Sequence, residues 1–390
     1  MQEEHYDIAI VGAGIVGLAH ALAAVKKGFK VAVFERNTKA FGASIRNFGL
    51  SWPVGQKPDR MERALRSRQI WSDLSKEANF WVKQNGSLHL AYHQDELDVL
   101  TEFYDDMPSD GYQCELLSEV QVIEKSPIVN KLGLLGGLWS NTEMTVNPRE
   151  AILKISTFLS KTHQVTFHYE TLITEINYPN LLAGSNKWQA DKIIVCSGSD
   201  FESLYPVLFS ELPITKCKLQ MMKALASDDL PELGPTLCAG LTLRHYAAFE
   251  KCPSLDKLRK RYDTDSPEYK KWGIHVLLAQ NNAGELIIGD SHEYATSHDP
   301  FIKEDINEYI LTYLKTFTNL KKISISERWI GIYPSLKNDD TELVINPEEG
   351  VTIVNGLGGA GMTLSFGLAE ENMNNLLKKQ NEPSRKNRLS

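Results

Sequence analysis

Residues 6–36 carry the feature that most constrains what this chain can fold into. An apolar run at 8–11 leads into a glycine turn at 12–17, helix formers follow at 18–27, and a second apolar run occupies 31–34. Continuous apolar strands that alternate with a helix are typical of a parallel sheet covered on both faces. The chain is therefore predicted to begin with a β-α-β unit of an α/β fold.

The glycine turn has the spacing of a dinucleotide-binding loop. Gly12 permits a tight turn, Gly14 lets the backbone approach a pyrophosphate, and Gly17 lets the helix pack against the strand. Amide groups at the helix start then face the phosphates, where the helix dipole also favours negative charge. Glu35, followed by Arg36, ends the second strand and is placed to accept hydrogen bonds from ribose hydroxyls. A tight turn that binds nothing has the same glycines, but the strand–turn–helix–strand context and the acidic residue favour a bound dinucleotide.

Two further segments decide between a flavin and a nicotinamide dinucleotide. Residues 42–49 come just after the ribose-binding strand, and a second glycine cluster at 356–363 opens the last helix. A flavin needs both. One is a loop that runs past the pyrophosphate to the ring, and the other is a helix N-terminus that stabilises negative charge at the pyrimidine edge of the reduced ring. A nicotinamide enzyme does not need the distant cluster, so the sequence predicts FAD.

The bulk composition limits the partners and the compartment. A net charge of −8 argues against a nucleic-acid partner, although a pocket can still hold local positive charge for an anionic substrate. The five cysteines are odd in number and lack C-x-x-C spacing, which favours reduced thiols over a disulfide scaffold or a zinc site. No apolar run reaches membrane-spanning length, and the first residues lack the pattern of a signal peptide. These features predict a cytoplasmic protein and leave its oligomeric state open.

The order of the segments predicts two interleaved domains. Buried parallel strands recur at 192–196 and 351–354, and a helix is expected from 363 to 377. Other stretches, such as 218–223 and 286–290, have the character of a more antiparallel sheet. We predict a discontinuous FAD-binding domain over 1–80, 141–207 and 325–380, a substrate domain over 81–140 and 208–324, and a polar tail over 381–390.

These motifs resemble the FAD-dependent oxidoreductases of the D-amino-acid oxidase fold, which include glycine and sarcosine oxidases. The resemblance rests on the N-terminal turn with Glu35-Arg36, Gly-Ala-Ser-x-Arg-Asn at 42–47, the strand ending at Ser197-Gly198, Trp329-x-Gly331 and the terminal glycine cluster. It implies an α/β fold with a Rossmann-like (GR2-type) FAD-binding domain and an inserted, largely antiparallel α+β substrate domain. It also implies that a hydride passes from the substrate carbon to flavin N5, that water hydrolyses the resulting imine, and that oxygen commonly reoxidises the flavin to give hydrogen peroxide.

A narrower resemblance concerns the substrate. Four segments look like a bacterial group of these enzymes proposed to oxidise aminophosphonates: 44–50, 52–56, 86–92 and 219–222. Better-known oxidases clamp a carboxylate with the arginine of a Trp-x-Gly-x-Arg-Pro motif, and Tyr333 takes that place here. A planar guanidinium forks onto a planar carboxylate, which a phenol cannot do. The departure favours a small amine whose acidic group is recognised differently, such as an aminophosphonate approached by Arg46, Lys218 or histidines.

Hydride removal from a neutral amine needs no strong acid or base, so the protein mainly orients the substrate and holds its charged end. The candidates for this task are Arg46, Asn47, Gln220, Met221, His275 and Tyr333. Asn47 is also suited to closing a turn, and His275 and Tyr333 to packing in a core. The predicted cofactor contacts are Gly12, Gly14, Ile15, Val16, Gly17, Glu35, Arg36, Ser44, Arg46, Asn47, Ser197, Gly198, Gly331, Gly358, Gly359, Ala360, Gly361, Met362 and Thr363.

The remaining histidines do not predict a metal site. The pairs His245-Tyr246 and His292-Glu293 are loosely spaced along the chain, and the expected chemistry needs no metal. Some relatives attach their flavin through Cys or His, but residues 42–49 contain neither and no cysteine lies beyond Cys252. FAD is therefore predicted to bind non-covalently.

Two other functions remain open at this level. A flavoprotein dehydrogenase would pass electrons to a quinone or a carrier protein, and the yield of peroxide on turnover separates it from an oxidase. A flavin-binding partner or sensor without turnover would share the cofactor motifs. This function is favoured if no small amine reduces the flavin.

Overall fold

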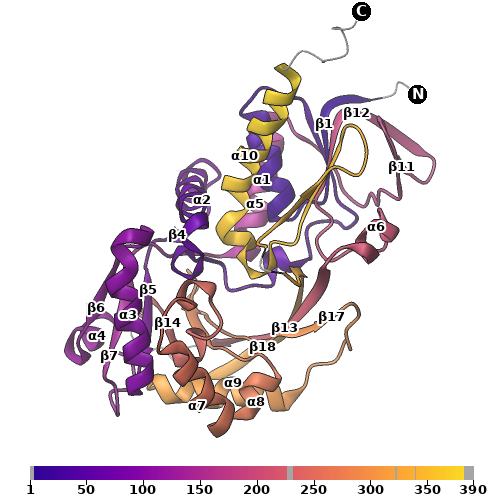
Figure 1. Ribbon diagram of the computed structural model, residues 1–390. Coiled ribbons are helices and arrows are strands. Elements are labelled where there is room, and N and C mark those ends of the chain that lie inside the picture. Colours follow the sequence, from indigo (N-terminus) through magenta and orange to yellow (C-terminus); the bar gives the residue numbers. More distant parts are fainter. Residues whose placement is uncertain (1–3, 226–231, 321–322, 339, 382–390) are drawn as a thin grey trace, which may run out of the picture.

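The computed structural model describes residues 4–225, 232–320, 323–338 and 340–381, arranged in two halves that each contain one large sheet. Figure 1 shows the half with β1 (His5–Val11) and α10 (Gly361–Asn381) above the half built from the middle of the chain. A small third sheet pairs β8 (Met144–Val146) with β3 (Leu50–Ser51) and with β4 (Val82–Lys83).

The first sheet is the parallel one that the apolar runs predict. Its parallel strands lie in the order β9 (Thr166–His168), β2 (Val31–Phe34), β1, β12 (Asn186–Val195) and β20 (Val351–Asn355). The antiparallel additions are β11 (Asn180–Ala183) on β12, β10 (Glu175–Asn177) on β11 and β19 (Leu343–Ile345) on β20. The winding direction reverses between β1 and β12, so their carboxyl ends flank a crevice of the kind that binds ligands in open α/β sheets.

Helices cover this sheet as the apolar stripes require. α1 (Ile15–Val25) packs against α10 and α5 (Pro148–His163), and α2 (Pro58–Glu77) packs on the other side of α10 (Figure 1). The indole nitrogen of Trp71 donates to the backbone oxygen of Met362 at 2.8 Å and ties α2 to the start of α10. α10 runs further than the predicted end at 377, and the predicted polar tail from 382 on lies outside the described residues. Within the described segments, no helix is both long and apolar enough to span a bilayer.

The second sheet is largely antiparallel, as predicted. Its strands lie in the order β17 (Glu293–Ala295), β13 (Ile214–Leu225), β16 (Leu286–Gly289), β15 (Leu277–Gln280), β14 (Thr236–Ala239), β5 (Ser87–Ala91), β7 (Gly136–Ser140) and β6 (Cys114–Leu117). Only the β5–β14 pair in this order is parallel. The helices of this half are α3 (Gln94–Asp110), α4 (Glu119–Lys125), α7 (Leu255–Asp265), α8 (Pro267–Lys271) and α9 (Glu304–Phe317).

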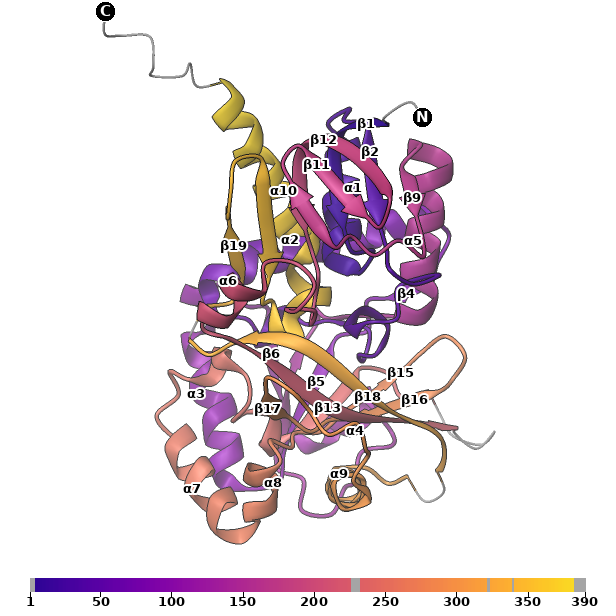
Figure 2. The same ribbon diagram turned by 90° about the vertical axis from the view of Figure 1, so that its right-hand side faces the viewer.

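One domain boundary differs from the prediction. β18 (Ser324–Leu336), which we assigned almost entirely to the FAD-binding domain, pairs along its length with β13 and therefore belongs to the second sheet. Figure 2 shows the two long strands crossing the middle of the molecule beneath the first half. Sequence periodicity identifies a strand but not its partner, because pairing depends on contacts between distant segments. As a result, β18 brings residues 329–334 of the sheet up to the junction of the halves.

Candidate functional site

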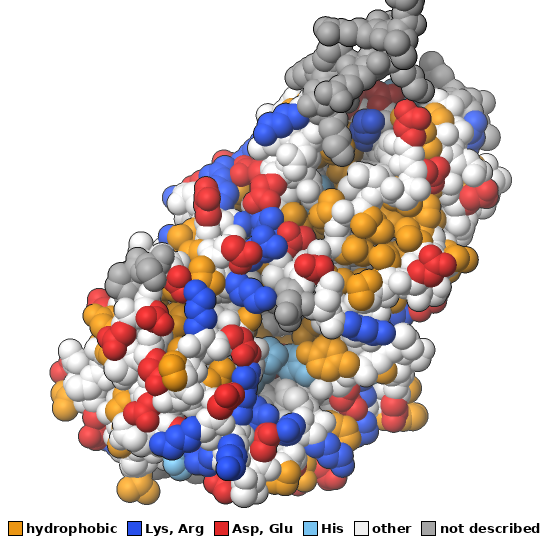
Figure 3. Space-filling view, viewed as in Figure 1, with side chains coloured by type: hydrophobic (Ala, Val, Ile, Leu, Met, Phe, Trp, Pro, Cys, Tyr) orange, Lys and Arg blue, Asp and Glu red, His pale blue; other side chains and the backbone are white. Residues whose placement is uncertain are grey.

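A cavity of about 1110 Å³ lies between the two halves. The first half contributes the turn after β1, the loop after β2 and the glycine segment before α10, while the second half contributes residues of β13 and β18 and the side chains around His275. Figure 3 shows histidine side chains gathered at a hollow between the halves, beside hydrophobic side chains. The lining therefore combines a predicted dinucleotide groove with a wall from the predicted substrate domain.

Two of the three turn glycines are needed by the chain itself. Gly12 has a φ of +105°, and a Cβ there would collide with the backbone oxygen of Cys196. A Cβ on Gly17 would collide with the backbone oxygen of Gly12. Gly14 differs, because its φ of −69° suits any residue and the nearest atom to its Cβ position is Oγ of Ser44 at 3.1 Å. Gly14 thus keeps open a surface that lines the cavity, which is what a close-lying pyrophosphate requires, so these residues fit FAD.

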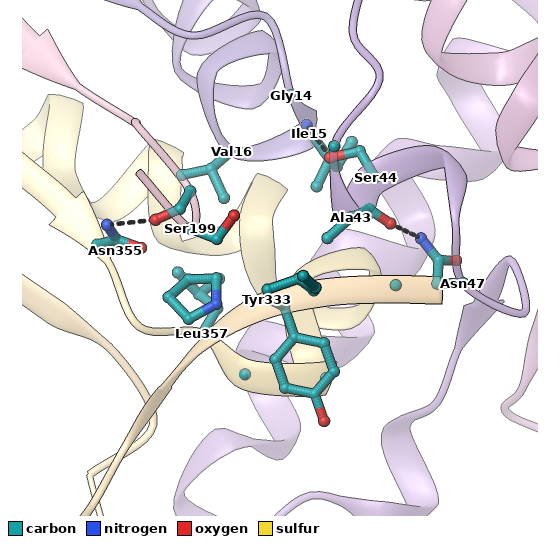
Figure 4. A pocket seen from close by; sticks show the side chains of 18 of the residues that line it. Gly14, Ile15, Val16, Ala43, Ser44, Asn47, Ser199, Tyr333, Asn355 and Leu357 are labelled. Carbon is teal, nitrogen blue, oxygen red and sulfur yellow. Dashed lines mark hydrogen bonds between the residues drawn. The ribbon is translucent and has the colours of Figure 1, made fainter. Parts of the chain in front are cut away.

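Side chains hold the turn in place from two directions. The amide of Ala13 donates to Oε2 of Glu35 at 3.1 Å, and the amide of Ile15 donates to Oγ of Ser44 at 2.8 Å (Figure 4). Glu35 also accepts from the amide of Asn37 at 3.1 Å. These bonds fix the Glu35 carboxylate at the cavity edge, and its further lone pairs leave it able to accept a ribose hydroxyl.

An ion pair closes the same region of the cavity. Arg36 lies 2.7 Å from the carboxylate of Asp200, which joins the end of β2 to the loop after β12. Burial alone would raise the pKa of Asp200, but hydrogen bonds from Ser203 and the charge of Arg36 lower it below its ordinary value. The end of β20 also holds this loop, because the side-chain amide of Asn355 donates to the oxygen of Gly198 at 3.0 Å (Figure 4).

The terminal glycine segment brings a second helix start to the cavity. Gly358 has a φ of +56°, and α10 begins three residues later at Gly361. A Cβ on Gly361 would lie only 3.7 Å from Cγ2 of Ile15, so the first turns of α1 and α10 lie side by side. Thr363 accepts a hydrogen bond from the amide of Trp52 at 2.9 Å. Two helix N-termini therefore meet at one cavity, where both favour bound negative charge.

Most of the residues singled out in the sequence line this cavity. Every predicted cofactor contact except Gly17 does so, and Gly17 serves the packing of helix on strand. Of the substrate candidates, Arg46, Asn47, Met221, His275 and Tyr333 line it.

Gln220 is the exception among the substrate candidates. Its side-chain amide donates to the oxygen of Lys303 and to Oδ1 of Asn307, at the start of α9. Lys218 points the same way, since its ammonium group donates to the oxygens of Asp299 and Phe301. Side chains alternate along a strand, so both lie on the face of β13 opposite Met221. The structure therefore places the side chains of both Gln220 and Lys218 outside the cavity, so the predicted substrate contact of Gln220 is not formed.

Asn47 forms hydrogen bonds within its own loop, whereas Arg46 forms one across to β18. The side-chain amide of Asn47 donates to the backbone oxygen of Ala43 at 2.9 Å (Figure 4), and its Oδ1 accepts from the backbone amide of Gly49. A guanidinium nitrogen of Arg46 donates to the oxygen of Ile330 at 3.3 Å. Asn47 closes a turn, which is one of the two roles predicted for it, and both residues line the cavity.

The wall contributed by the second half joins the predicted candidate His275 to two histidines, His245 and His292, that the sequence did not single out. His245, His275 and His292 each offer one donor atom, and these atoms lie within 4.8 Å of one another. The ring of His245 stacks on that of His275 with centroids 3.8 Å apart, and Asp290 lies 3.1 Å from Nε2 of His275. Sequence spacing misjudged this proximity, since the three histidines come from three separate loops. No local signal marks them, apart from their position next to strands of the inserted sheet.

Burial sets the protonation states of this wall. Water reaches the His245 ring through the cavity, yet protein surrounds its other sides, and burial together with His275 and His292 lowers its pKa well below 6.5. Burial likewise lowers the pKa of His292, against the opposing effect of Asp290. Burial raises the pKa of the Tyr333 phenol well above 10, so it stays a neutral hydrogen-bond donor.

A family comparison agrees with the geometry of the groove. The family model described as FAD dependent oxidoreductase (DAO) matches residues 7–372 of this chain. That range contains the glycine turn, the loop at 42–49, both sheets and the terminal glycine segment.

Individual relatives are distant in sequence and close in fold. Glycine oxidase from Geobacillus kaustophilus is 27% identical over 143 residues, which are 34% of this chain and 38% of that protein. Glycerol 3-phosphate dehydrogenase from Caloramator mitchellensis is 25% identical over 156 residues, 39% of this chain and 32% of that protein. The matched segments thus span only about a third of these curated relatives.

The solved structures extend the likeness to the whole chain. The crystal structure of the Geobacillus kaustophilus glycine oxidase superposes with a TM-score of 0.78 at 19% identity, covering 96% of this chain and 95% of that one. Iminodiacetate oxidase from a Chelativorans species gives a TM-score of 0.73 at 16% identity and covers 95% of both chains. At these identities the likeness establishes the shared fold.

Proposed function

The chain belongs to the family of FAD-dependent oxidoreductases, and from that premise we propose that it oxidises the carbon–nitrogen bond of a small amine. The observation that carries the proposal is one continuous cavity, with the FAD groove at one side and a wall of buried polar side chains at the other. FAD supplies, when bound, an acceptor for the hydride that leaves the substrate carbon. The protein has to hold the amine in that path and exclude competing water.

The groove residues have separable roles in holding FAD. Gly14 leaves room for the diphosphate, and the first turns of α1 and α10 direct positive dipole ends at bound negative charge. Glu35, fixed by backbone donors, accepts from the ribose. Cys196 lines the groove, but burial raises the pKa of its thiol, which makes it a poor nucleophile. FAD is accordingly proposed to bind without a covalent link.

We propose an amine with a tetrahedral acidic group, an aminophosphonate, as the substrate. Tyr333 lines the cavity where a carboxylate-clamping arginine would be expected, and a phenol offers one donor instead of a planar fork. A phosphonate has three acceptor oxygens in a tetrahedral array, which suits several separate donors. Tyr333 and Tyr246 offer such donors, and the three histidines line the same wall.

Oxidation of the amine leaves an imine that water hydrolyses to a carbonyl compound and a released amine or ammonia. We propose molecular oxygen as the electron acceptor, which makes hydrogen peroxide the second product. We also propose a cytoplasmic site of action, because all five cysteines are free thiols buried in the protein.

An anaerobic reduction screen tests the function. FAD-loaded protein is mixed with glycine, sarcosine, D-amino acids and aminoethylphosphonates, including N-methylated and hydroxylated forms, and flavin absorbance is followed. We expect bleaching by an aminophosphonate and peroxide on admission of air. Bleaching by glycine or sarcosine alone would contradict the substrate, bleaching without peroxide would favour a dehydrogenase, and no bleaching by any amine would contradict amine oxidation.

A further inference from the structure

His292 in the cavity wall is held as metal ligands are held. Nδ1 of His292 lies 2.9 Å from the oxygen of Gly273, which can only accept, so this nitrogen carries the proton and Nε2 presents a lone pair. In metal sites the second ring nitrogen of a ligating histidine almost always donates to a carbonyl or carboxylate, which fixes the tautomer and the ring orientation. The Nε2 atom of His275 lies 3.1 Å from Oδ1 of Asp290, a close contact that lacks hydrogen-bond geometry.

The same group contains buried polar atoms without partners. Nδ1 of His275 and Oδ1 of Asp290 form no hydrogen bond with any described residue, and the two residues are only 3% and 5% exposed. An unsatisfied buried polar group is destabilising, so such groups in native proteins call for a bound water or ion. Nε2 of His292 also faces Oδ2 of Asp290 at 3.8 Å, which is too long for a hydrogen bond.

The charge of this wall also favours a bound cation. Asp290 places a carboxylate beside the three histidines, where it would repel the acidic group of an anionic substrate. A divalent cation at the same place would neutralise the carboxylate and attract the anion. Three imidazole donors suit zinc-class ions, and they leave the fourth tetrahedral position open for an outside ligand.

We propose that His245, His275 and His292 bind a divalent transition-metal cation beside the Asp290 carboxylate, with Zn²⁺ as the reference ion, and that the cation holds the acidic group of the substrate. The metal site stands on the geometry alone, whereas its role toward the substrate rests on the proposed function.

Metal binding requires a small local adjustment. Zinc–nitrogen bonds of about 2.0–2.1 Å place two tetrahedral donors roughly 3.4 Å apart. The three donors lie within 4.8 Å of one another, so the group must contract. His245 is exposed to the cavity while the other two rings are buried, and rotation of its side chain closes the site.

Zinc titration by calorimetry tests the site. The protein is used FAD-loaded, freed of any histidine tag and stripped with a chelator. We expect one saturable equivalent of Zn²⁺, its loss in His245→Ala and His292→Ala, and a roughly 10–100-fold weaker affinity in Asp290→Asn. His93→Ala removes an exposed histidine outside the cavity and serves as the matched control, which should bind as the wild type does.

The flavin content of each variant reports whether it has folded. Absence of saturable binding in the wild type would overturn the site. So would wild-type affinity in a FAD-loaded His245→Ala protein, which is the variant least able to disturb packing because its ring is exposed.

A second titration tests the role of the metal. Methylphosphonate is added to zinc-loaded and zinc-free protein while flavin absorbance is followed, and zinc should strengthen its binding at least about 10-fold. Equal affinity in both forms would overturn the substrate-holding role. Zinc binding in a protein that no amine reduces would count against the proposed function and not against the site. Amine oxidation by a protein that binds no zinc would count against the metal site and not against the proposed function.

Discussion

The hydroxyl group of Tyr333 lies 3.7 Å from the position that a β-carbon would occupy on Gly359. Tyr333 comes from β18 of the second sheet, and Gly359 from the glycine segment before α10 in the first half. The contact places a phenol at the helix start that we assign to the flavin ring. Tyr333 therefore reaches from the second half to the glycine segment of the predicted cofactor groove.

Replacing Tyr333 with Phe should lower substrate affinity or turnover roughly 10-fold, because one hydrogen-bond donor is lost from the wall. FAD content should stay at the wild-type level. Steady-state kinetics with the amine found in the screen measures the effect, and Tyr309→Phe in α9 provides a control tyrosine away from the cavity. Kinetics identical to the wild type would remove Tyr333 from the substrate site.

Gly14→Val should give a folded protein that lacks FAD. The backbone at Gly14 has a φ of −69° that valine tolerates, so the added methyl groups enter the cavity instead of distorting the turn. Gly14→Ala should lose less cofactor, since its β-carbon meets only Ser44. The ratio of flavin to protein absorbance measures occupancy, and full occupancy of the valine variant would contradict the assigned path of the diphosphate.

Heat or acid denaturation should release FAD into solution. The loop at 42–49 has no cysteine or histidine, and burial raises the pKa of the Cys196 thiol that lines the groove. Precipitated protein is removed by centrifugation and the supernatant is measured at the flavin band. Flavin that stays with the pellet after denaturation would show a covalent bond.

Acid should destabilise the protein through His20. This buried ring donates from Nδ1 to the oxygen of Val16 at 2.7 Å and meets the amide of Asn372 in α10 with Nε2 at 3.1 Å. Burial lowers its pKa to about 4, below the 6.5 expected in the unfolded chain. The stabilising effect of a neutral ring is therefore complete above pH 6.5 and declines as the pH falls toward 4, by about 2 kcal/mol at pH 5.

A His20→Asn protein should accordingly show a smaller fall in Tm between pH 7 and pH 5 than the wild type does. His93→Asn, which changes an exposed histidine, should keep the wild-type fall. An unchanged pH dependence in His20→Asn would mean that His20 is not the acid-sensitive group.

Lys218→Met should destabilise the fold without altering the flavin spectrum. The Lys218 side chain is 1% exposed, and its ammonium group lies 3.4 Å from Glu293 and donates to two backbone oxygens of the loop before α9. Its loss leaves part-buried acceptors without this donor, at a cost of about 1–3 kcal/mol. Thermal unfolding measures the change, and Lys216→Met on the same strand gives the comparison. A normal Tm with a raised KM would show instead that Lys218 contributes to substrate binding.

The FAD-binding half was predictable because its signals are local. The turn at 12–17, Glu35 and the cluster at 356–363 each act through backbone shape within a few residues, and backbone shape follows from glycine spacing and apolar runs. The same locality explains why the strands at 192–196 and 351–354 were recognised as buried and parallel.

Which residues form the wall opposite the cofactor groove is determined only by the tertiary structure. His245, His275 and His292 come from separate loops that the second sheet brings together, and nothing in the sequence around any of them encodes the other two. The face of β13 that meets the cavity, and with it the exclusion of Gln220, followed from strand pairing. Contacts between distant segments are set by the packing of whole sheets, so a cofactor that is bound by local turns can be read from a sequence while a substrate site assembled across loops cannot.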